Sequence, residues 1–132
     1  MRLCVCDQIL YVSDQDRAIR FYSDLLGFEL RIKHGKYWAE LAAGTTTLAL
    51  HLAEPKKEEE SGAAAAAPKE PTAGSASASF FVKDLKSFHA RALEFDGCKV
   101  VKEPVQQPWG GFQAHYADPD GLGFTVVELP SL

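Results

Sequence analysis

Residues 9–28 read ILYVSDQDRAIRFYSDLLGF, and this stretch decides the fold because its pattern returns later in the chain. A short apolar run is followed by Asp14 and by an amphipathic segment that ends at Gly27. Residues 80–97, FFVKDLKSFHARALEFDG, repeat that order with Asp84 and Gly97. The offset is 84 − 14 = 70 for the aspartates and 97 − 27 = 70 for the glycines. Two coincidences at one register indicate an internal repeat.

Each repeated segment has the signals of a helix with defined ends. The aspartate can accept hydrogen bonds from the first backbone N–H groups of a helix, and the glycine can take the left-handed conformation that ends one. We therefore predict helices between Asp14 and Gly27 and between Asp84 and Gly97. The apolar side chains recur at helical spacing in both segments, at Ala18, Ile19, Tyr22, Leu25 and Leu26 and at Leu85, Phe88, Ala92 and Phe95.

After each helix the hydrophobic pattern changes to the period of two that strands require. The strands predicted are residues 28–33, 37–41 and 47–52 in the first half, and 99–102, 112–117 and 124–129 in the second. Residues 118–121, Asp-Pro-Asp-Gly, are a strong turn signal between the last two strands. Each half thus reads strand, helix, strand, strand, strand, which predicts an α+β fold of two βαβββ modules whose sheets curve around a shared cupped cavity.

Residues 55–74 separate the halves and are poor in branched and aromatic side chains, so we predict a flexible linker there. The predicted organisation is a single domain with a first module at 1–54 and a second at 75–132. Halves of about 50 residues bury little surface alone. They are expected to pack together, either within one chain or by exchange between two.

Composition excludes several classes of partner. The net charge is 14 − 18 = −4 over 132 residues, and no long basic run is present, so nucleic acid is not an expected partner. The most apolar N-terminal stretch, residues 3–12, is interrupted by Asp7 and Gln8 and is far shorter than the ~20 residues of a spanning helix, so a membrane is not expected either. The chain has three cysteines and no Asn, and hence no glycosylation sequon, which predicts a cytoplasmic protein. Cys4 and Cys6 are compatible with a redox or metal pair, but we favour small buried hydrophobic side chains on one face of an extended segment.

The repeat and its motifs resemble the vicinal oxygen chelate superfamily, which includes glyoxalase, bleomycin-resistance and ring-cleaving dioxygenase proteins. The motifs are residues 11–14 (YVSD), 18–22 (AIRFY), 26–28 (LGF) and 118–121 (DPDG). The resemblance covers everything except the linker. It implies a cupped cavity, a homodimer, and in enzyme members a divalent metal held by His, Gln or Glu side chains on the first and last strand of each module.

Carried over residue by residue, the implied metal positions are Asp7, Ala49, Ser77 and Thr125. All four depart from the ligand pattern of the family. Alanine cannot ligate, serine and threonine are weak neutral ligands, and a single aspartate does not hold a transition metal in water. We therefore expect no obligatory metal and no other cofactor.

Asp7 and His51 are the candidate catalytic residues. Strand alternation places both on the cavity side, where they would form an acid/base dyad or two ligands of an atypical metal site. The alternative is that Asp7 is solvated at the mouth of the strand and His51 bonds a backbone carbonyl. His115, which shares a strand face with Gln113, is a further candidate. His34 in a turn and His89 in the second helix are expected to be structural or solvent-facing.

Aromatic side chains are the stronger signal for ligand binding. Several aromatic residues fall on or beside strands that line the predicted cavity, and Trp109 lies in a loop between Pro108 and two glycines. Flat, stiff side chains with a few polar neighbours suit a planar or amphipathic small molecule. The ligand-binding residues predicted are Asp7, Tyr11, Trp38, Glu40, His51, Trp109 and Phe112, with Glu40 placed to meet a basic ligand group.

Three functions follow. The first is a glyoxalase- or bleomycin-resistance-like protein that binds a small organic molecule in an aromatic-lined cavity. The second is a lyase or dioxygenase that holds a divalent metal through Asp7, His51 and His115. The third is a purely assembling domain whose cavity is filled by its own side chains.

Overall fold

The computed structural model describes residues 1–53, 73 and 75–131. The chain divides into two compact units, Met1–Lys56 and Lys57–Leu132, which we call the first and second modules and describe separately. The predicted linker, residues 55–74, lies outside the described residues except for residue 73. Within the described residues, no helix has the length and apolar character needed to cross a membrane.

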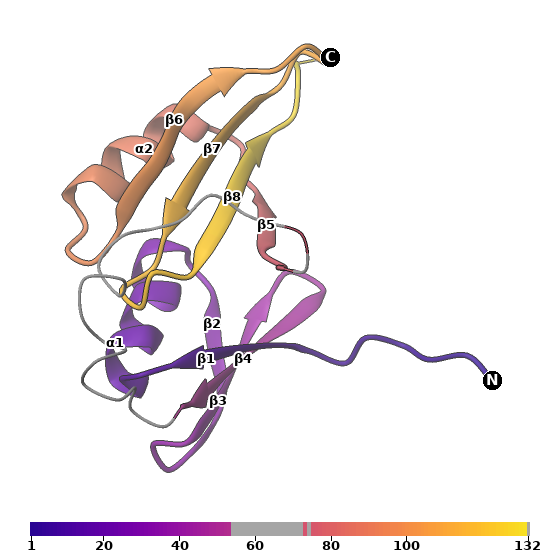
Figure 1. The fold of residues 1–132 in the computed structure, drawn as a ribbon, viewed down its shortest axis with the longest axis vertical. Helices are drawn as coiled ribbons and strands as arrows, with labels where there is room; N and C mark the ends of the chain where they lie inside the picture. Colours follow the sequence, from indigo (N-terminus) through magenta and orange to yellow (C-terminus); the bar gives the residue numbers. More distant parts are fainter. Residues whose placement is uncertain (54–72, 74, 132) are drawn as a thin grey trace. The chain divides into compact units, whose positions relative to one another are not determined.

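The first module is a βαβββ unit, as predicted (Figure 1). Its sheet has the order β1-β4-β3-β2, in which β1 runs parallel to β4 and the other pairs are antiparallel. The predicted single helix is an α-helix that continues into a π-helical turn, η1. The elements are β1 (Gln8–Val12), α1 (Gln15–Arg20), η1 (Phe21–Leu25), β2 (Glu29–His34), β3 (Trp38–Ala43) and β4 (Thr46–Leu52).

The second module repeats this topology, with the sheet order β5-β8-β7-β6 and a parallel β5–β8 pair. Most strand bounds differ from the predicted ones by one or two residues, and the largest difference is in β6, which was predicted to end at Lys102 but runs through Pro104 to Gln106. Proline is tolerated there because β6 is an edge strand and because Pro104 lies where its register with β7 shifts, between Lys102 and Val105. The elements are β5 (Ala78–Phe81), α2 (Leu85–Glu94), β6 (Lys99–Gln106), β7 (Phe112–Ala117) and β8 (Gly123–Glu128).

Both helices begin and end where the sequence predicts. Asp14 accepts a hydrogen bond from the backbone N–H of Arg17 at 3.0 Å, and Asp84 accepts one from that of Ser87 at 3.2 Å. Asp84 also accepts from the Ser87 hydroxyl at 2.6 Å, and this bond, together with the backbone bond, lowers the pKa of its carboxyl group. Gly27 and the glycine at 97 have positive φ, as helix-ending glycines do.

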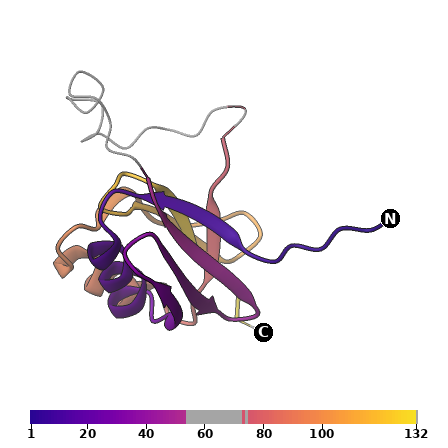
Figure 2. The same ribbon diagram turned by 90° about the horizontal axis from the view of Figure 1, so that it is seen from below.

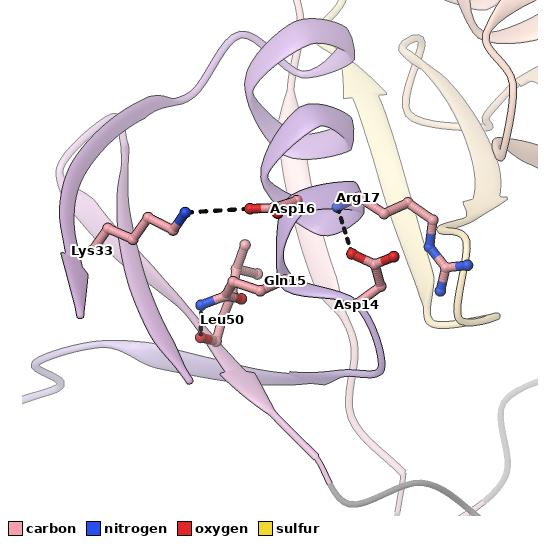
Figure 3. Close-up of polar contacts among 6 residues, drawn as sticks. All are labelled: Asp14, Gln15, Asp16, Arg17, Lys33 and Leu50. Carbon is pink, nitrogen blue, oxygen red and sulfur yellow. Dashed lines mark hydrogen bonds and ion pairs between the residues drawn. The ribbon is translucent and has the colours of Figure 1, made fainter. Parts of the chain in front are cut away.

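Each helix covers one face of its own sheet. The other face, which we call the open face, carries no helix from the part of the chain that the structure describes. In the first module α1 lies over β4, where the Gln15 side-chain amide donates to the Leu50 carbonyl at 3.2 Å (Figure 3). The same close-up shows Lys33 of β2 reaching Asp16 on the helix at 3.2 Å. In the second module Phe88 of α2 contacts Tyr116 of β7 edge-on, with ring centroids 5.3 Å apart. These contacts fix which strand residues point to the open faces.

Both outer hairpins carry a β-bulge at the same place in the repeat. The register shifts between Leu30 and Ile32 in the first module and between Val100 and Lys102 in the second. The two bulges are again 70 residues apart, since 30 + 70 = 100 and 32 + 70 = 102. After a bulge, the side chains of the strand point to the opposite side of the sheet from the one that simple alternation predicts. Ile32 and Lys102 therefore point to the open faces.

Residues 1–7 lead away from β1 without regular secondary structure (Figure 2). Cys4 and Cys6 are exposed there, so the prediction that they are buried hydrophobic side chains was wrong. The length of β4 accounts for Cys4. Gln8 pairs with Leu48, so at the same register Cys6 would face Thr46, the first residue of β4, and Cys4 would lie beyond the end of that strand.

Candidate functional site

The open face of the first module carries a row of aromatic and imidazole rings. Tyr11 on β1 and Trp38 on β3 both pair in register with His51 on β4. The His51 ring centroid lies 5.3 Å from that of Tyr11 and 5.9 Å from that of Trp38, which meets it edge-on. Directly opposed residues on neighbouring strands share a face. Three predicted ligand-binding residues thus form one continuous surface, which we call the aromatic row.

Glu40 is fixed beside this row. The indole Nε1 of Trp38 donates to Glu40 Oε2 at 2.8 Å, and both side chains are half-buried. Glu40 pairs with Ile32 of β2 on one side and with Ala49 of β4 on the other. Ala49 in turn pairs with Ile9 of β1, so these residues form one line across the sheet. The two isoleucines are each 41% exposed. The result is a carboxylate held in one orientation, with small and apolar neighbours along its own row.

The His51 ring is oriented by the backbone. Its Nδ1 lies 2.8 Å from the carbonyl oxygen of Leu52. A carbonyl only accepts, so Nδ1 carries the proton and donates, and in the neutral ring Nε2 is left as an acceptor. A hydrogen bond from His51 to a backbone carbonyl is the alternative to the Asp7–His51 dyad that the sequence left open.

The structure does not bring Asp7 and His51 together as a dyad. Asp7 precedes β1, whose first residue pairs with Leu48, whereas His51 pairs with Tyr11 near the other end of the strand. Tyr11 lies four residues further along the chain than Asp7, which is about 13 Å at the usual rise of a strand. An acid/base pair needs contact at about 3 Å or one bridging water.

Trp109 and Phe112 belong to the second module, in different settings. Trp109 lies in the predicted loop and is 50% exposed. Its ring covers Gly111 so closely that a Cβ there would lie 2.0 Å from Trp109 Cζ3. Phe112 begins β7 and alternates with Ala114 and Tyr116, so it lies on the α2 side of the sheet rather than on the open face.

The four positions at which the resemblance implies metal ligands do not fit a divalent ion. Ala49 is fully buried and has no donor atom, and Ser77 precedes β5 as an exposed residue. The Thr125 hydroxyl is engaged with His115, at 2.9 Å from its Nδ1. Among the residues that the structure describes, no three His, Cys, Asp or Glu side chains gather as a metal ion would require.

A second polar cluster was not predicted from the sequence. His89 Nδ1 lies 2.9 Å from the hydroxyl of Tyr116, and His89 Nε2 lies 2.6 Å from Glu103 Oε2. Burial, with smaller contributions from Cys98 and Glu103, raises the pKa of Tyr116. The phenol therefore stays neutral, and the cluster links α2 to β6 and β7. The one sequence signal was the position of His89 on the second helix beside Phe88.

A tandem pair of βαβββ modules, each with a helix on one face and an open face on the other, defines the vicinal oxygen chelate fold. The chain belongs to the Glyoxalase/Bleomycin resistance protein/Dioxygenase superfamily, whose family model matches residues 5–126. No curated protein matches the chain significantly.

Solved structures share the fold over nearly the whole chain. One is a lactoylglutathione lyase from Agrobacterium tumefaciens, at 22% identity and a TM-score of 0.66, covering 95% of this chain and 92% of the other. A superfamily member from Sphaerobacter thermophilus has 25% identity and a TM-score of 0.67, covering 97% and 98%. A superfamily enzyme from Burkholderia phytofirmans has 17% identity and a TM-score of 0.70, covering 93% and 96%. At these identities the likeness concerns the fold.

Proposed function

We propose that the chain binds a small planar organic molecule, with a positively charged group, on the open face of the first module and without an obligatory metal. One observation carries this proposal. Tyr11, His51 and Trp38 line up as adjoining rings, and the Trp38 indole holds the Glu40 carboxylate beside them. The open face is the one that the resemblance assigns to the cavity.

The physical basis is stacking combined with charge. Tyr11 is 57% exposed, so a planar ligand can cover its ring and gain about 0.5–1.5 kcal/mol per aromatic contact. A cation above the ring faces adds about 0.5–2 kcal/mol. The carboxylate of Glu40 is already oriented by Trp38, so little side-chain entropy is lost when it meets that cation. Binding of this kind is sequestration or recognition and requires no reacting group.

Isothermal titration calorimetry with three probes of similar size tests the proposal. The probes are N-methylquinolinium, uncharged 1-methylnaphthalene and anionic 1-naphthoate. We expect the cation to bind at least about tenfold more tightly than the other two, as one cation–π or ionic contact would give. Quenching of Trp38 fluorescence, measured in a Trp109→Phe background, locates the ligand on the aromatic row.

Two variants separate the role of Glu40 from that of overall charge. Glu40→Gln removes the charge at the site and should abolish the preference for the cation. Glu94→Gln removes one charge from the exposed surface of α2 and should leave the preference intact. Equal affinity for all three probes, or no saturable binding, would contradict the proposal.

The absence of an obligatory metal is tested separately. Protein purified without chelator is expected to contain no stoichiometric metal, and Zn²⁺, Ni²⁺, Mn²⁺ or Fe²⁺ should leave the melting temperature unchanged. A stoichiometric metal would instead support the alternative, a metal-dependent lyase or dioxygenase.

A further inference from the structure

We propose that Cys4 and Cys6 form a binding site for a monovalent soft metal ion, Cu(I), on the segment that precedes β1. We call residues 1–7 the N-terminal arm. The arm contains no residue of the aromatic row, and the inference does not depend on the proposed function.

The N-terminal arm holds most of the sulfur in the chain. The sequence has three cysteines and one methionine, and Met1, Cys4 and Cys6 are three of these four residues. The fourth, Cys98, belongs to the second module. Thiolate and thioether sulfurs are the soft ligands that select Cu(I) among the metals of proteins. This concentration of soft donors singles out the arm as the place for such an ion.

The exposure of both thiols removes the packing explanation for this pair. Free cysteine is among the residue types most often buried, where it acts as a small hydrophobic side chain. Cys4 and Cys6 are instead exposed free thiols, and Met1 in the same arm is exposed as well. The sequence left a redox or metal pair open as the alternative to burial. With burial excluded, the reactivity of the two sulfurs is what the arm presents to solvent.

The backbone of the arm favours an ion between the sulfurs over a bond between them. The arm runs out from β1 as an extended trace without regular secondary structure (Figures 1 and 2). In extended backbone, residues two apart point to the same side, and their Cα atoms lie about 6.6 Å apart. Disulfides span Cα distances of about 4.4–6.8 Å, so this spacing is at their upper limit. An ion between the two sulfur atoms fits the wider spacing.

The number of ligands decides which ion fits. A structural Zn²⁺ site takes four ligands, whereas Cu(I) is satisfied by two thiolates, with a thioether as a weaker extra donor. Over residues 1–53, 73 and 75–131, no group of three His, Cys, Asp or Glu side chains is placed to hold a metal ion. The pair alone therefore suits Cu(I) and leaves a divalent ion short of ligands. Binding replaces the two thiol protons, which pass to the buffer, and copper stays in its Cu(I) state.

This site is separate from the four positions at which the resemblance implies metal ligands. Of those four, only Asp7 lies in the arm, and its carboxylate is a hard ligand that suits other metals. Because both thiols are exposed, a bound ion exchanges with thiol reductants during purification. The purified protein is therefore still expected to be free of metal until Cu(I) is supplied.

Competition with bicinchoninate, a coloured Cu(I) chelator, tests the proposal. The reduced full chain, freed of small thiols and kept under nitrogen, is titrated into the Cu(I)–bicinchoninate complex. We expect the absorbance of the complex to fall until a single equivalent of Cu(I) has passed to each chain, and native mass spectrometry gives the stoichiometry. Bound Cu(I) should also protect Cys4 and Cys6 from iodoacetamide, which peptide mass spectrometry measures.

Matched variants assign the binding to the arm. Cys4→Ser and Cys6→Ser should each abolish the uptake of Cu(I), because one thiolate cannot chelate the ion. Cys98→Ser makes the same chemical change in the second module and should leave the uptake unchanged. Burial raises the pKa of the Cys98 thiol to about 11, so that thiol gives up its proton reluctantly. Far-ultraviolet circular dichroism checks that all three variants are folded.

Four outcomes would overturn the proposal. The first is no transfer of Cu(I) from bicinchoninate to the wild type. The second is uptake that persists in Cys4→Ser or Cys6→Ser. The third is one ion for every two chains, since the pair within one chain would then not be the site. The fourth is displacement of the bound Cu(I) by Zn²⁺, which would indicate a site with more ligands than the arm supplies.

Discussion

Replacing Gly111 by alanine is the sharpest perturbation of the loop that carries Trp109. A Cβ at this position would lie 2.0 Å from Trp109 Cζ3, 2.4 Å from Trp109 Cη2 and 2.5 Å from the Glu128 backbone oxygen. All three distances are shorter than a carbon atom tolerates. The indole can swing away, but the Glu128 carbonyl belongs to β8 and cannot move without disturbing the sheet. The alanine therefore forces a shift of the loop, of the strand or of both.

Overpacking of this kind costs about 1–3 kcal/mol of the free energy of unfolding. At about 2 kcal/mol, and with a typical urea slope, the unfolding midpoint should fall by roughly 1 M. The measurement is urea denaturation followed by far-ultraviolet circular dichroism. Gly123→Ala is the matched control, because that glycine begins β8 and the nearest atom to its added Cβ is the Tyr116 oxygen at 3.9 Å. The control should change the midpoint little.

A double-mutant cycle separates the two contacts. Trp109→Ala removes the indole and leaves the contact with the Glu128 oxygen, so Gly111→Ala should cost less in that background but still more than Gly123→Ala. If Gly111→Ala unfolds at the same urea concentration as the wild type, the packing described for this loop is incorrect.

Two further predictions concern ionisable groups. Because the Ser87 hydrogen bonds lower the pKa of Asp84 below its ordinary 3.8, the charged carboxylate stabilises the fold above that value, and stability should fall as the pH drops through the lowered pKa. Asp84→Asn should flatten this acid limb in thermal melts, and an unchanged limb would argue against the cap. Burial raises the pKa of Cys98 to about 11, so at pH 8 iodoacetamide should alkylate Cys4 and Cys6 well before Cys98. Peptide mass spectrometry measures the order, and equal rates at all three thiols would refute it.

The elements were predictable from the sequence because their signals are local. Asp14 and Gly27 mark one helix by capping chemistry alone, and strand alternation was enough to place Glu40 and Trp38 on one face. The bulge, the continuation of β6 past Pro104 and the π-helical turn depend on what each strand or helix meets in the folded chain. No local pattern reports those contacts.

The site was predictable only in part, for the same reason. The aromatic row follows from alternation on three strands, but its register required the pairing of β1 with β4. The dyad of Asp7 and His51 assumed that sharing a face meant contact, and the register separates them along the strand. The cluster of Glu103, His89 and Tyr116 joins residues from a predicted loop, a helix and a strand, so it could be found only in three dimensions.

The bulges of the two outer hairpins affect how readily copies of this chain can aggregate by pairing their edge strands. β2 and β6 are edge strands, and each is interrupted by a bulge, with Pro104 as an additional interruption in β6. An interrupted edge is a poor template for a foreign strand. Within each sheet, strand capture should therefore favour the opposite edge, β1 or β5, and these strands are only five and four residues long.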